Sequence, residues 1–517
     1  MKALLFGNRK RGVSTLEVLI AFALLTLALT AVSVAFFSNQ SLAVDTQLGT
    51  EALSKASAML ETARSNSRID FDLVNPTTTS EKSGPVTYTK SLAVSQIDLF
   101  TKQTTSTISW QVGSRTVQTQ LSTLLTNLLA TNGSGSTCSS VVVGDWKRPQ
   151  HHDFDFGQLG VNAGNGSGFG ISNIALFNKR LYVTTYANPS TDKDTLFIFD
   201  INSDPSIAPI FRGSVDNDTV SSVGPNALTI ASSTSKIYAY LASPSSFSRG
   251  QLQVVDVTDP TKPVLVKTFK LPASAVASAG TPFTIFYKNG YIYLGLSKIT
   301  GGGDEFNIID VGGGVGSPLN PVWKGGYDAG SAVNDIFVKN NYAYLATPGN
   351  ENLTILDVSN PAQPVRMGGY TPPNLPESNG VGSNHGETIA VVGTTAYLGR
   401  TYGTKEFYML DVSSSTAPTV LGSLDAGTGN LPSIYGLTVR DYLAFFITNT
   451  QFQVWNIANP SNPVPYSADA TTGSFLAISS LGGTGTADDC ENNSFYIAVA
   501  SNQVTPKDIL SVISPTP

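Results

Sequence analysis

The sequence predicts a chain of two parts. The first is an α+β stem, made of a long N-terminal helix and a small antiparallel sheet, and the second is an all-β propeller with seven blades. Three observations support this. A long apolar stretch begins at residue 13, β-rich segments with a hairpin follow it, and one strand-and-turn motif then recurs at intervals of 45 to 56 residues. At 517 residues the chain is too long for one ordinary domain, so a multidomain arrangement is expected.

The composition limits the classes of function. Charged residues make up 13% of the chain and the net charge is -6, so the chain lacks the basic character of a nucleic-acid partner. The 47 Gly and the many small polar residues favour strands joined by turns. Three histidines leave little for metal chemistry. No cofactor is predicted, and calcium stays an open alternative.

The apolar segment at residues 13–37 has the properties of a membrane helix. It contains 25 residues (37 − 13 + 1), enough to cross a bilayer. Basic side chains precede it at Lys2, Arg9, Lys10 and Arg11. They favour a cytoplasmic N-terminus and an exported remainder. A plain signal anchor would explain the hydropathy, but Glu17 is costly in hydrocarbon, and such a carboxylate usually marks a function or a partner.

The residues around Glu17 resemble a known processing signal. Basic residues, then Gly12, then VSTLEVLIAF resemble the N-terminus of type IV prepilins and pseudopilins. The resemblance implies a leader at residues 1–12, cleavage between Gly12 and Val13, and N-methylation of Val13, a position where phenylalanine is most common in that family. It also places Glu17 fifth in the mature chain, where its carboxylate would pair with the new amine of a neighbouring subunit.

The resemblance also implies partners and a location. The partners would be a prepilin peptidase, other pilins or pseudopilins through the N-terminal helix, and the cytoplasmic membrane before assembly. The precursor would be a single-pass membrane protein with its N-terminus inside the cell. The mature protein would belong to a pilus or pilus-like filament, with the propeller extracellular or periplasmic.

The stem continues beyond the apolar segment. Apolar residues recur at helical spacing toward Ser65, and β-rich segments follow, with a hairpin expected about Gly113-Ser114. The hairpin ISWQVGSRTVQTQLSTLL resembles the last strands of minor pilins. This resemblance implies a transmembrane and filament-core helix at 13–37 and a pilin-like α+β domain at 38–130. A flexible linker is predicted at 131–140.

A repeat fills residues 141–517. Six copies read LFIFDINSDP, LQVVDVTDP, FNIIDVGGG, LTILDVSNP, FYMLDVSSS and FQVWNIANP. Their repeat acids, or the amide in the last copy, are Asp200, Asp256, Asp310, Asp357, Asp411 and Asn456. Spacings of 56, 54, 47, 54 and 45 residues suit one four-stranded blade per copy. Each side chain is expected to accept hydrogen bonds from backbone amides of the following turn, which is a structural role. The pattern resembles LVIVD-repeat proteins, whose repeats form β-propellers.

The seventh blade is predicted to borrow a strand. The C-terminal segments supply three strands, with Ser511 at the repeat-acid position, and residues 141–148 supply the fourth and close the ring. Cys138 precedes that borrowed strand and Cys490 precedes the strand at 494–501. A disulfide between these cysteines is favoured over two free thiols.

The propeller offers few candidates for chemistry. His151, His152 and Asp153 could hold a metal ion, but a solvated loop is favoured, and His385 is expected to be structural. No enzymatic activity is predicted. The expected function is that of a minor pilin-like surface protein, displaying the propeller at a pilus tip for adhesion or for recognition of an extracellular glycan or protein. Two alternatives are an anchored extracellular enzyme with a propeller active site and a minor pseudopilin of a secretion system.

Overall fold

The structure describes the parts of the chain that carry regular secondary structure. This computed structural model covers residues 15–69, 74–98, 101–126, 145–155, 159, 161, 171–185, 195–216, 224–233, 236–243, 250–276, 280–348, 351–372, 385–401, 405–427, 433–448, 451–466, 476–477, 483–489, 494–500 and 508–516. The chain divides into two compact units. One contains Met1–Asn66, Val74–Ser95 and Gln103–Leu125, and the other contains Ser67–Leu73, Gln96–Lys102 and Thr126–Pro517.

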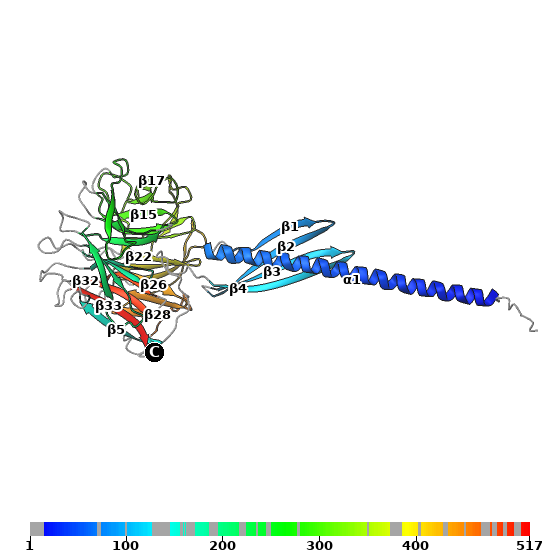
Figure 1. Cartoon of the computed structure of the whole chain (residues 1–517). Helices are drawn as coiled ribbons and strands as arrows, with labels where there is room; N and C mark the ends of the chain where they lie inside the picture. Colours follow the sequence, from blue (N-terminus) through cyan, green and yellow to red (C-terminus); the bar gives the residue numbers. More distant parts are fainter. Residues whose placement is uncertain are drawn as a thin grey trace, which may run out of the picture. The chain divides into compact units, whose positions relative to one another are not determined.

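The first unit, called here the helix–sheet unit, combines one long helix with four strands. Its elements are α1 (Thr15–Ile69), β1 (Thr77–Ser83), β2 (Val86–Asp98), β3 (Thr101–Val112) and β4 (Arg115–Thr126) (Figure 1). No proline interrupts α1. The strands pair in chain order. Gly84 and Gly113 have positive φ angles in two of the connecting turns, which glycine adopts without strain.

The C-terminal part of α1 packs on this sheet. Ala52 and Ala56 are fully buried against Tyr88, Ile108 and Trp110. Small alanine side chains let the helix approach the sheet closely, so the large aromatic side chains fill the space between them. The rings of Tyr88 and Trp110 lie 5.7 Å apart, centroid to centroid. This cluster is the hydrophobic core of the helix–sheet unit.

The second unit confirms the predicted propeller. Seven sheets follow the helix–sheet unit, and six of them pair their strands in chain order. Blades 1 to 3 are β6 (Ile171–Phe177), β7 (Arg180–Thr185), β8 (Leu196–Asp200) and β9 (Ile210–Val215); β10 (Ala227–Ser232), β11 (Ile237–Ala242), β12 (Leu252–Asp256) and β13 (Val264–Phe269); β14 (Pro282–Lys288), β15 (Tyr291–Leu296), β16 (Phe306–Asp310) and β17 (Val322–Tyr327).

Blades 4 to 6 repeat this arrangement. They are β18 (Asp335–Lys339), β19 (Tyr342–Ala346), β20 (Leu353–Asp357) and β21 (Val365–Tyr370); β22 (His385–Val392), β23 (Thr395–Thr401), β24 (Phe407–Asp411) and β25 (Thr419–Leu424); β26 (Gly436–Arg440), β27 (Leu443–Ile447), β28 (Gln451–Asn456) and β29 (Val464–Pro465), with β30 (Leu476–Ala477) also paired to β28.

Blade 7 closes the ring, as predicted, by pairing three C-terminal strands with a strand from the start of the propeller segment. It is built from β31 (Gly483–Asp489), β32 (Ser494–Ala500), β33 (Asp508–Thr516) and β5 (Asp145–Asp155). Figure 1 shows β5 beside β33 at the C-terminus. The borrowed strand extends to Asp155, beyond the predicted limit of 148, while residues 141–144 lie outside the described residues. The register also corrects one alignment. In blade 7, Ile513 pairs with the second residue of β32, and in blade 4, Leu356 pairs with the second residue of β19, so Ile513 and Leu356 occupy equivalent positions. Ser511 is therefore equivalent to Thr354 and not, as predicted, to Asp357.

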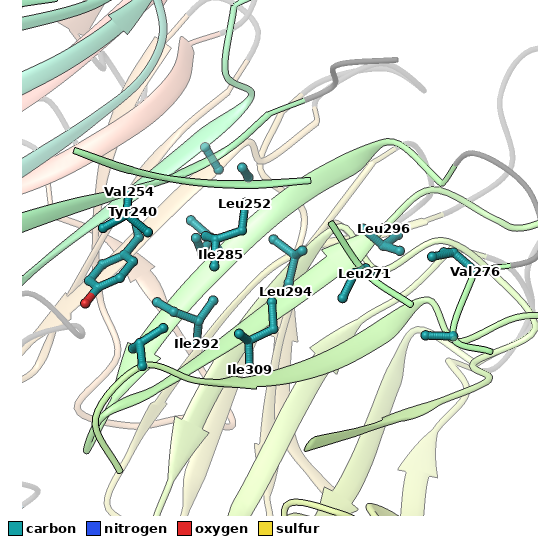
Figure 2. Packing of buried hydrophobic residues seen from close by; sticks show 14 of the residues in the cluster. Tyr240, Leu252, Val254, Leu271, Val276, Ile285, Ile292, Leu294, Leu296 and Ile309 are labelled. Carbon is teal, nitrogen blue, oxygen red and sulfur yellow. The ribbon is translucent and has the colours of Figure 1, made fainter. Parts of the chain in front are cut away.

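The first strand of each blade lies innermost and contacts the first strands of both neighbouring blades, so the seven first strands form a closed ring. Hydrophobic clusters fill the space between successive blades. Figure 2 shows one of them, in which Leu252 and Val254 of blade 2 meet Ile285, Ile292 and Leu294 of blade 3. All five side chains are buried. Because each cluster draws on two blades, every blade depends on its neighbours for a complete core.

A glycine in the outer strand makes the second contact between blades. The glycines at this position are Gly213, Gly325, Gly368 and Gly422. Each pairs with the middle residue of the third strand, and each approaches the turn of the next blade. A Cβ atom at Gly422 would overlap the carbonyl oxygen of Pro460. The outer strand therefore needs glycine there so that two blades can touch through their backbones.

The pilin-like α+β stem in the predicted fold class is wrong. The described chain is nearly all β, with thirty-three strands and one helix, α1. The helix α1 continues without a break to Ile69, as the helical spacing of apolar residues toward Ser65 predicts. The physical reason is that the repeated strand-and-turn motif supplies most of the ordered backbone. Across the part of the chain that the structure describes, no helix is both long and apolar enough to span a membrane.

Candidate functional site

The two ends of the propeller differ in their connections. At one end, here called the turn face, first and second strands are joined by tight hairpins whose residues include Asn178, Asn289, Asn340 and Asp441 at positive φ. At the other end, here called the loop face, the fourth strand of one blade ends and the first strand of the next begins, with longer stretches of sequence between them, as from Val215 to Ala227 and from Tyr370 to His385. Binding residues usually lie on loops held by a rigid scaffold, so the loop face is the candidate functional face.

The repeat acids lie on the turn face. Five of the six accept a hydrogen bond from the backbone N–H two residues further on, an arrangement that stabilises a turn. These bonds join Asp256 to Thr258, Asp310 to Gly312, Asp357 to Ser359, Asp411 to Ser413 and Asn456 to Ala458, over 2.8 to 3.1 Å. The role of these side chains in the described structure is to hold the turn between the third and fourth strands.

Three repeat acids have further contacts, and one of them, Asp256, also accepts from Lys236 Nζ at 2.6 Å. Both Asp310 carboxylate oxygens together accept from four backbone amides, at Gly312, Gly313, Gly314 and Gly316, each over 3.0 Å. Burial raises the pKa of this carboxyl, but the four amides outweigh it and the net shift is downward. Asp200 instead accepts from Arg180 Nε at 3.0 Å and Arg212 Nε at 2.7 Å.

A second repeated polar position lies at the loop face, and the sequence analysis did not identify it. It lies five residues before each repeat acid and is occupied by Thr195, Gln251, Glu305, Asn352, Glu406 and Gln451. Gln251 accepts from the Leu271 amide at 3.0 Å, and Glu406 accepts from the Ala426 amide at 2.9 Å. Each bond holds the chain just after the fourth strand. The signal was available in the sequence, because a polar residue recurs there at the start of otherwise apolar strands.

Asp335 connects the inner strands of three blades at the loop face. Its carboxylate accepts from the Ile336 amide at 2.8 Å, the Ile389 amide at 2.9 Å and the Thr388 hydroxyl at 3.0 Å. The Thr284 hydroxyl of blade 3 lies 3.4 Å away. Burial raises the pKa of the Asp335 carboxyl to about 6 in spite of these donors. The Asp335 side chain thus links neighbouring blades through hydrogen bonds, and its carboxyl has a pKa close to neutral pH.

Glu387, on the inner strand of blade 5, is the second carboxyl of this group. Its Oε2 accepts from Asn334 Nδ2 at 3.2 Å, and the same amide nitrogen donates to the Gly386 carbonyl at 2.9 Å. Burial, and after it the negative charge of Asp335, raise the pKa of Glu387 to about 7. His385 begins the same strand, and burial lowers its pKa. Asp335 and Glu387 therefore lie near each other at the loop-face end of the inner ring, where His385 begins its strand, and we call these three residues the axial carboxyl site.

The predicted metal candidates do not converge. His151, His152 and Asp153 lie within strand β5 and not in a loop. Side chains alternate along a strand, so His152 points to the opposite face from the other two. His151 Nε2 lies 3.5 Å from an Asp153 oxygen, and Asp153 also accepts from the Ser511 hydroxyl at 2.6 Å. Within the described residues, no group of three or more His, Cys, Asp or Glu side chains could hold a metal ion.

Several predicted site residues cannot be placed. Gly12, Val13, Cys138 and Cys490 lie outside the described residues, so cleavage, N-methylation and the disulfide remain predictions. Glu17 belongs to α1, but its side chain is outside the described part of the structure.

Comparison with known proteins agrees with the repeat. Residues 235–270 and 329–372, in blades 2 and 4, match the family model described as the LVIVD repeat. The chain contains LVIVD repeats. No curated protein matches the chain.

Three solved structures illustrate the similar folds that were found. A periplasmic gluconolactonase from Pseudomonas aeruginosa shares 11% identity with a TM-score of 0.44, covering 60% of this chain and 85% of that one. The N-terminal domain of Nup159 shares 8% identity with a TM-score of 0.41, covering 72% and 96%. A hypothetical selenium-binding protein from Sulfolobus tokodaii shares 9% identity with a TM-score of 0.43, covering 65% and 83%.

Proposed function

We propose that the protein is a minor, type IV pilin-like surface component that displays its propeller for adhesion or ligand recognition. The observation that carries this proposal is the processing signal, Gly12-Val13 with Glu17 five residues into the mature chain, placed at the start of a 55-residue helix. A propeller attached to such a helix would be carried outside the cell by filament assembly or membrane export.

The exposed surface of α1 supports the proposal. Large apolar side chains near its N-terminus, including Leu19, Phe22, Leu25 and Leu27, are between 55% and 70% exposed. An isolated helix in water would not keep so many apolar side chains uncovered, so this segment needs a membrane or neighbouring subunits around it. Covering by neighbouring subunits would bring Glu17 of one chain close to the new amine of another.

Two experiments test the anchor. N-terminal sequencing of the mature protein is expected to begin at methylated Val13, and Gly12→Ala is expected to leave the leader attached. A start at any other residue would contradict the processing claim. An immunoblot should detect the protein in small amounts in a preparation of sheared pili. Its absence there, together with its presence in the cell envelope of a strain with an intact secretion system, would favour the pseudopilin alternative.

Recognition by the propeller needs a separate test. Cells that display the intact protein are expected to adhere to a glycan or protein surface that cells lacking the gene do not bind. Substitutions on the loop face should reduce adhesion, while Asp357→Asn on the turn face should leave it unchanged, because Asn456 shows that an amide fills the same turn. Equal loss from both faces would contradict recognition through the loop face.

The axial carboxyl site favours a second candidate, an anchored extracellular hydrolase. Two carboxyls with pKa values raised to about 6 and about 7 can hold and release a proton at neutral pH, as general acid–base catalysis requires. Turnover of a lactone or glycoside that is lost in Glu387→Gln would support this candidate. Adhesion that persists in the same variant would instead favour recognition without chemistry.

A further inference from the structure

Blade 5 departs from its neighbours at one buried position on the loop face. In each of blades 1 to 6, one residue at the end of the second strand donates its backbone N–H to the backbone carbonyl of the repeated polar residue. In most of these blades this donor residue is small and uncharged. These residues are Thr185, Ser243, Thr347 and Thr448. Blade 5 has Arg400 there, donating its amide to the Glu406 carbonyl over 2.8 Å. A charge at a buried position is costly, so its presence in one blade alone indicates a local role.

The Arg400 guanidinium is held by neutral groups. Only 2% of the residue is exposed. Nε donates to Asn352 Oδ1 of blade 4 at 2.6 Å, and Nη1 donates to the Lys405 carbonyl at 2.9 Å. The guanidinium lies 5.3 Å from the ring centre of Tyr408, which provides a cation–π contact. Among the described residues, no carboxylate oxygen lies within 4.0 Å of it. Burial lowers the pKa of Arg400, and the nearby Tyr408, Glu406 and Tyr370 side chains oppose this shift without cancelling it.

Three buried polar atoms around this cation have no hydrogen-bond partner among the described residues. They are Arg400 Nη2, Glu406 Oε1 and Tyr370 Oη. Tyr370 ends the outer strand of blade 4, and its ring lies 5.8 Å from that of Tyr408. Arg400 senses the charges of both Glu406 and Tyr370, so the three groups lie close together at the boundary of the two blades. Buried donors without acceptors are uncommon in native structures and call for an explanation.

We propose that Arg400, Tyr370 and Glu406 form a subsite for the carboxylate of an acidic ligand, such as a uronic acid unit of a glycan. This inference rests on the proposed recognition function and specifies its ligand class. Arg400 Nη2 and the Tyr370 hydroxyl both donate, and a carboxylate oxygen accepts from both. When Glu406 is protonated, the ligand would also supply a counter-ion to the buried guanidinium, and charge-assisted bonds of this kind are the strong ones.

Glu406 gives the subsite a pH dependence with a defined sign. Burial, and after it the negative charge of Asp425, raise the pKa of Glu406 to about 7, against the opposing effects of the Ala426 amide and the Arg400 charge. Below that pH the carboxyl is protonated and can donate a third hydrogen bond to the ligand, whereas above it the negative charge repels the ligand. Binding is therefore expected to tighten up to about tenfold between pH 8 and pH 6, in line with the change in the protonated fraction. Tyr370 keeps its proton throughout, because burial, followed by the charge of Tyr408, raises its pKa to about 12.

The test is titration calorimetry of the full chain in detergent with D-galacturonate, using D-galactose as the neutral counterpart. Galacturonate is expected to bind and galactose to bind at least about tenfold more weakly, as the loss of a buried charge-assisted bond implies. Arg400→Gln should weaken galacturonate binding about tenfold or more, and Tyr370→Phe, which removes only the hydroxyl, by about threefold to tenfold. The matched control is Arg366→Gln, which removes an exposed arginine of blade 4 and should change neither.

The outcomes separate this inference from the proposed function. Equal binding of both sugars, or galacturonate binding that survives in folded Arg400→Gln and Tyr370→Phe, overturns the subsite. A crystal structure with galacturonate that shows ordered water alone between the three groups overturns it as well. If galacturonate fails to bind while cells displaying the protein still adhere to a neutral glycan or a protein, recognition stands and the acidic subsite does not. Loss of adhesion as well would count against both.

Discussion

The raised pKa of Asp335 predicts that acid stabilises the propeller over a range in which many proteins lose stability. The perturbation that isolates this effect is Asp335→Asn, which keeps the size of the side chain and removes its charge. In the native protein the carboxyl binds its proton more tightly than in the unfolded chain, because the pKa rises from 3.8 to about 6. The resulting stabilisation is complete below the unfolded value and is lost as pH rises through about 6.

The magnitude follows from the two pKa values. A shift of this size corresponds to about 3 kcal/mol when the carboxyl is fully titrated, and about 1.4 kcal/mol of it appears between pH 7.5 and pH 5. The charge of Asp335 also raises the pKa of Glu387, so removing it lowers that second pKa and reduces the gain further. The wild type should therefore gain at least about 1.4 kcal/mol more than Asp335→Asn over this pH interval.

The assay is urea denaturation of both proteins at pH 5 and pH 7.5, read by tryptophan fluorescence. Trp323 and Trp455 report on the propeller unit, in blades 3 and 6. The quantity of interest is the difference between the two proteins in the pH dependence of their unfolding free energies, because other titrating groups cancel in it. Asp357→Asn is the matched control and should behave as wild type. A wild-type gain equal to that of Asp335→Asn would refute the reasoning.

Three further predictions concern stability. Asp310→Ala leaves four backbone amides without their acceptor. We expect this substitution to lower the unfolding free energy by about 2–4 kcal/mol in urea denaturation. A decrease in unfolding free energy smaller than the contribution of one ordinary hydrogen bond would count against this account. Gly422→Ala pushes a Cβ atom onto the Pro460 carbonyl and should cost about 1–3 kcal/mol or more, whereas Gly49→Ala, with open space around it, should not destabilise. Trp110→Ala should remove about 3–5 kcal/mol from the helix–sheet unit, and calorimetry should show the propeller transition unmoved.

Local regularities made much of the propeller predictable. Each repeat places an apolar strand before an acid and a turn, and the strand period and the turn chemistry are both properties of neighbouring residues. The sequence therefore located the third strand of blades 1 to 6, the acids that hold their turns, and the need for a borrowed strand in blade 7. It also located the hairpin at Gly113, where positive φ requires glycine.

The errors arose where local pattern is weak. β5 was predicted to stop at 148, because HHDFD has no apolar run, yet pairing with β33 extends the strand to Asp155. The same pairing moved His151 and Asp153 onto one face of a strand and His152 onto the other. The pilin-like class of the stem came from the N-terminal signal and from the resemblance of the hairpin ISWQVGSRTVQTQLSTLL to minor pilins. Both are local features, and they carry no information about the composition of the whole fold.

The sequence alone determined the repeat, its period and the identity of the turn residues, because these depend on interactions within a few residues. Only the tertiary structure decided which side chains meet at the loop face. Asp335 reaches Ile389, and Arg400 reaches Asn352, over sequence separations of 54 and 48 residues. Those contacts exist because closing the ring packs the blades side by side, and the resulting burial gives these carboxyls and this arginine their altered pKa values.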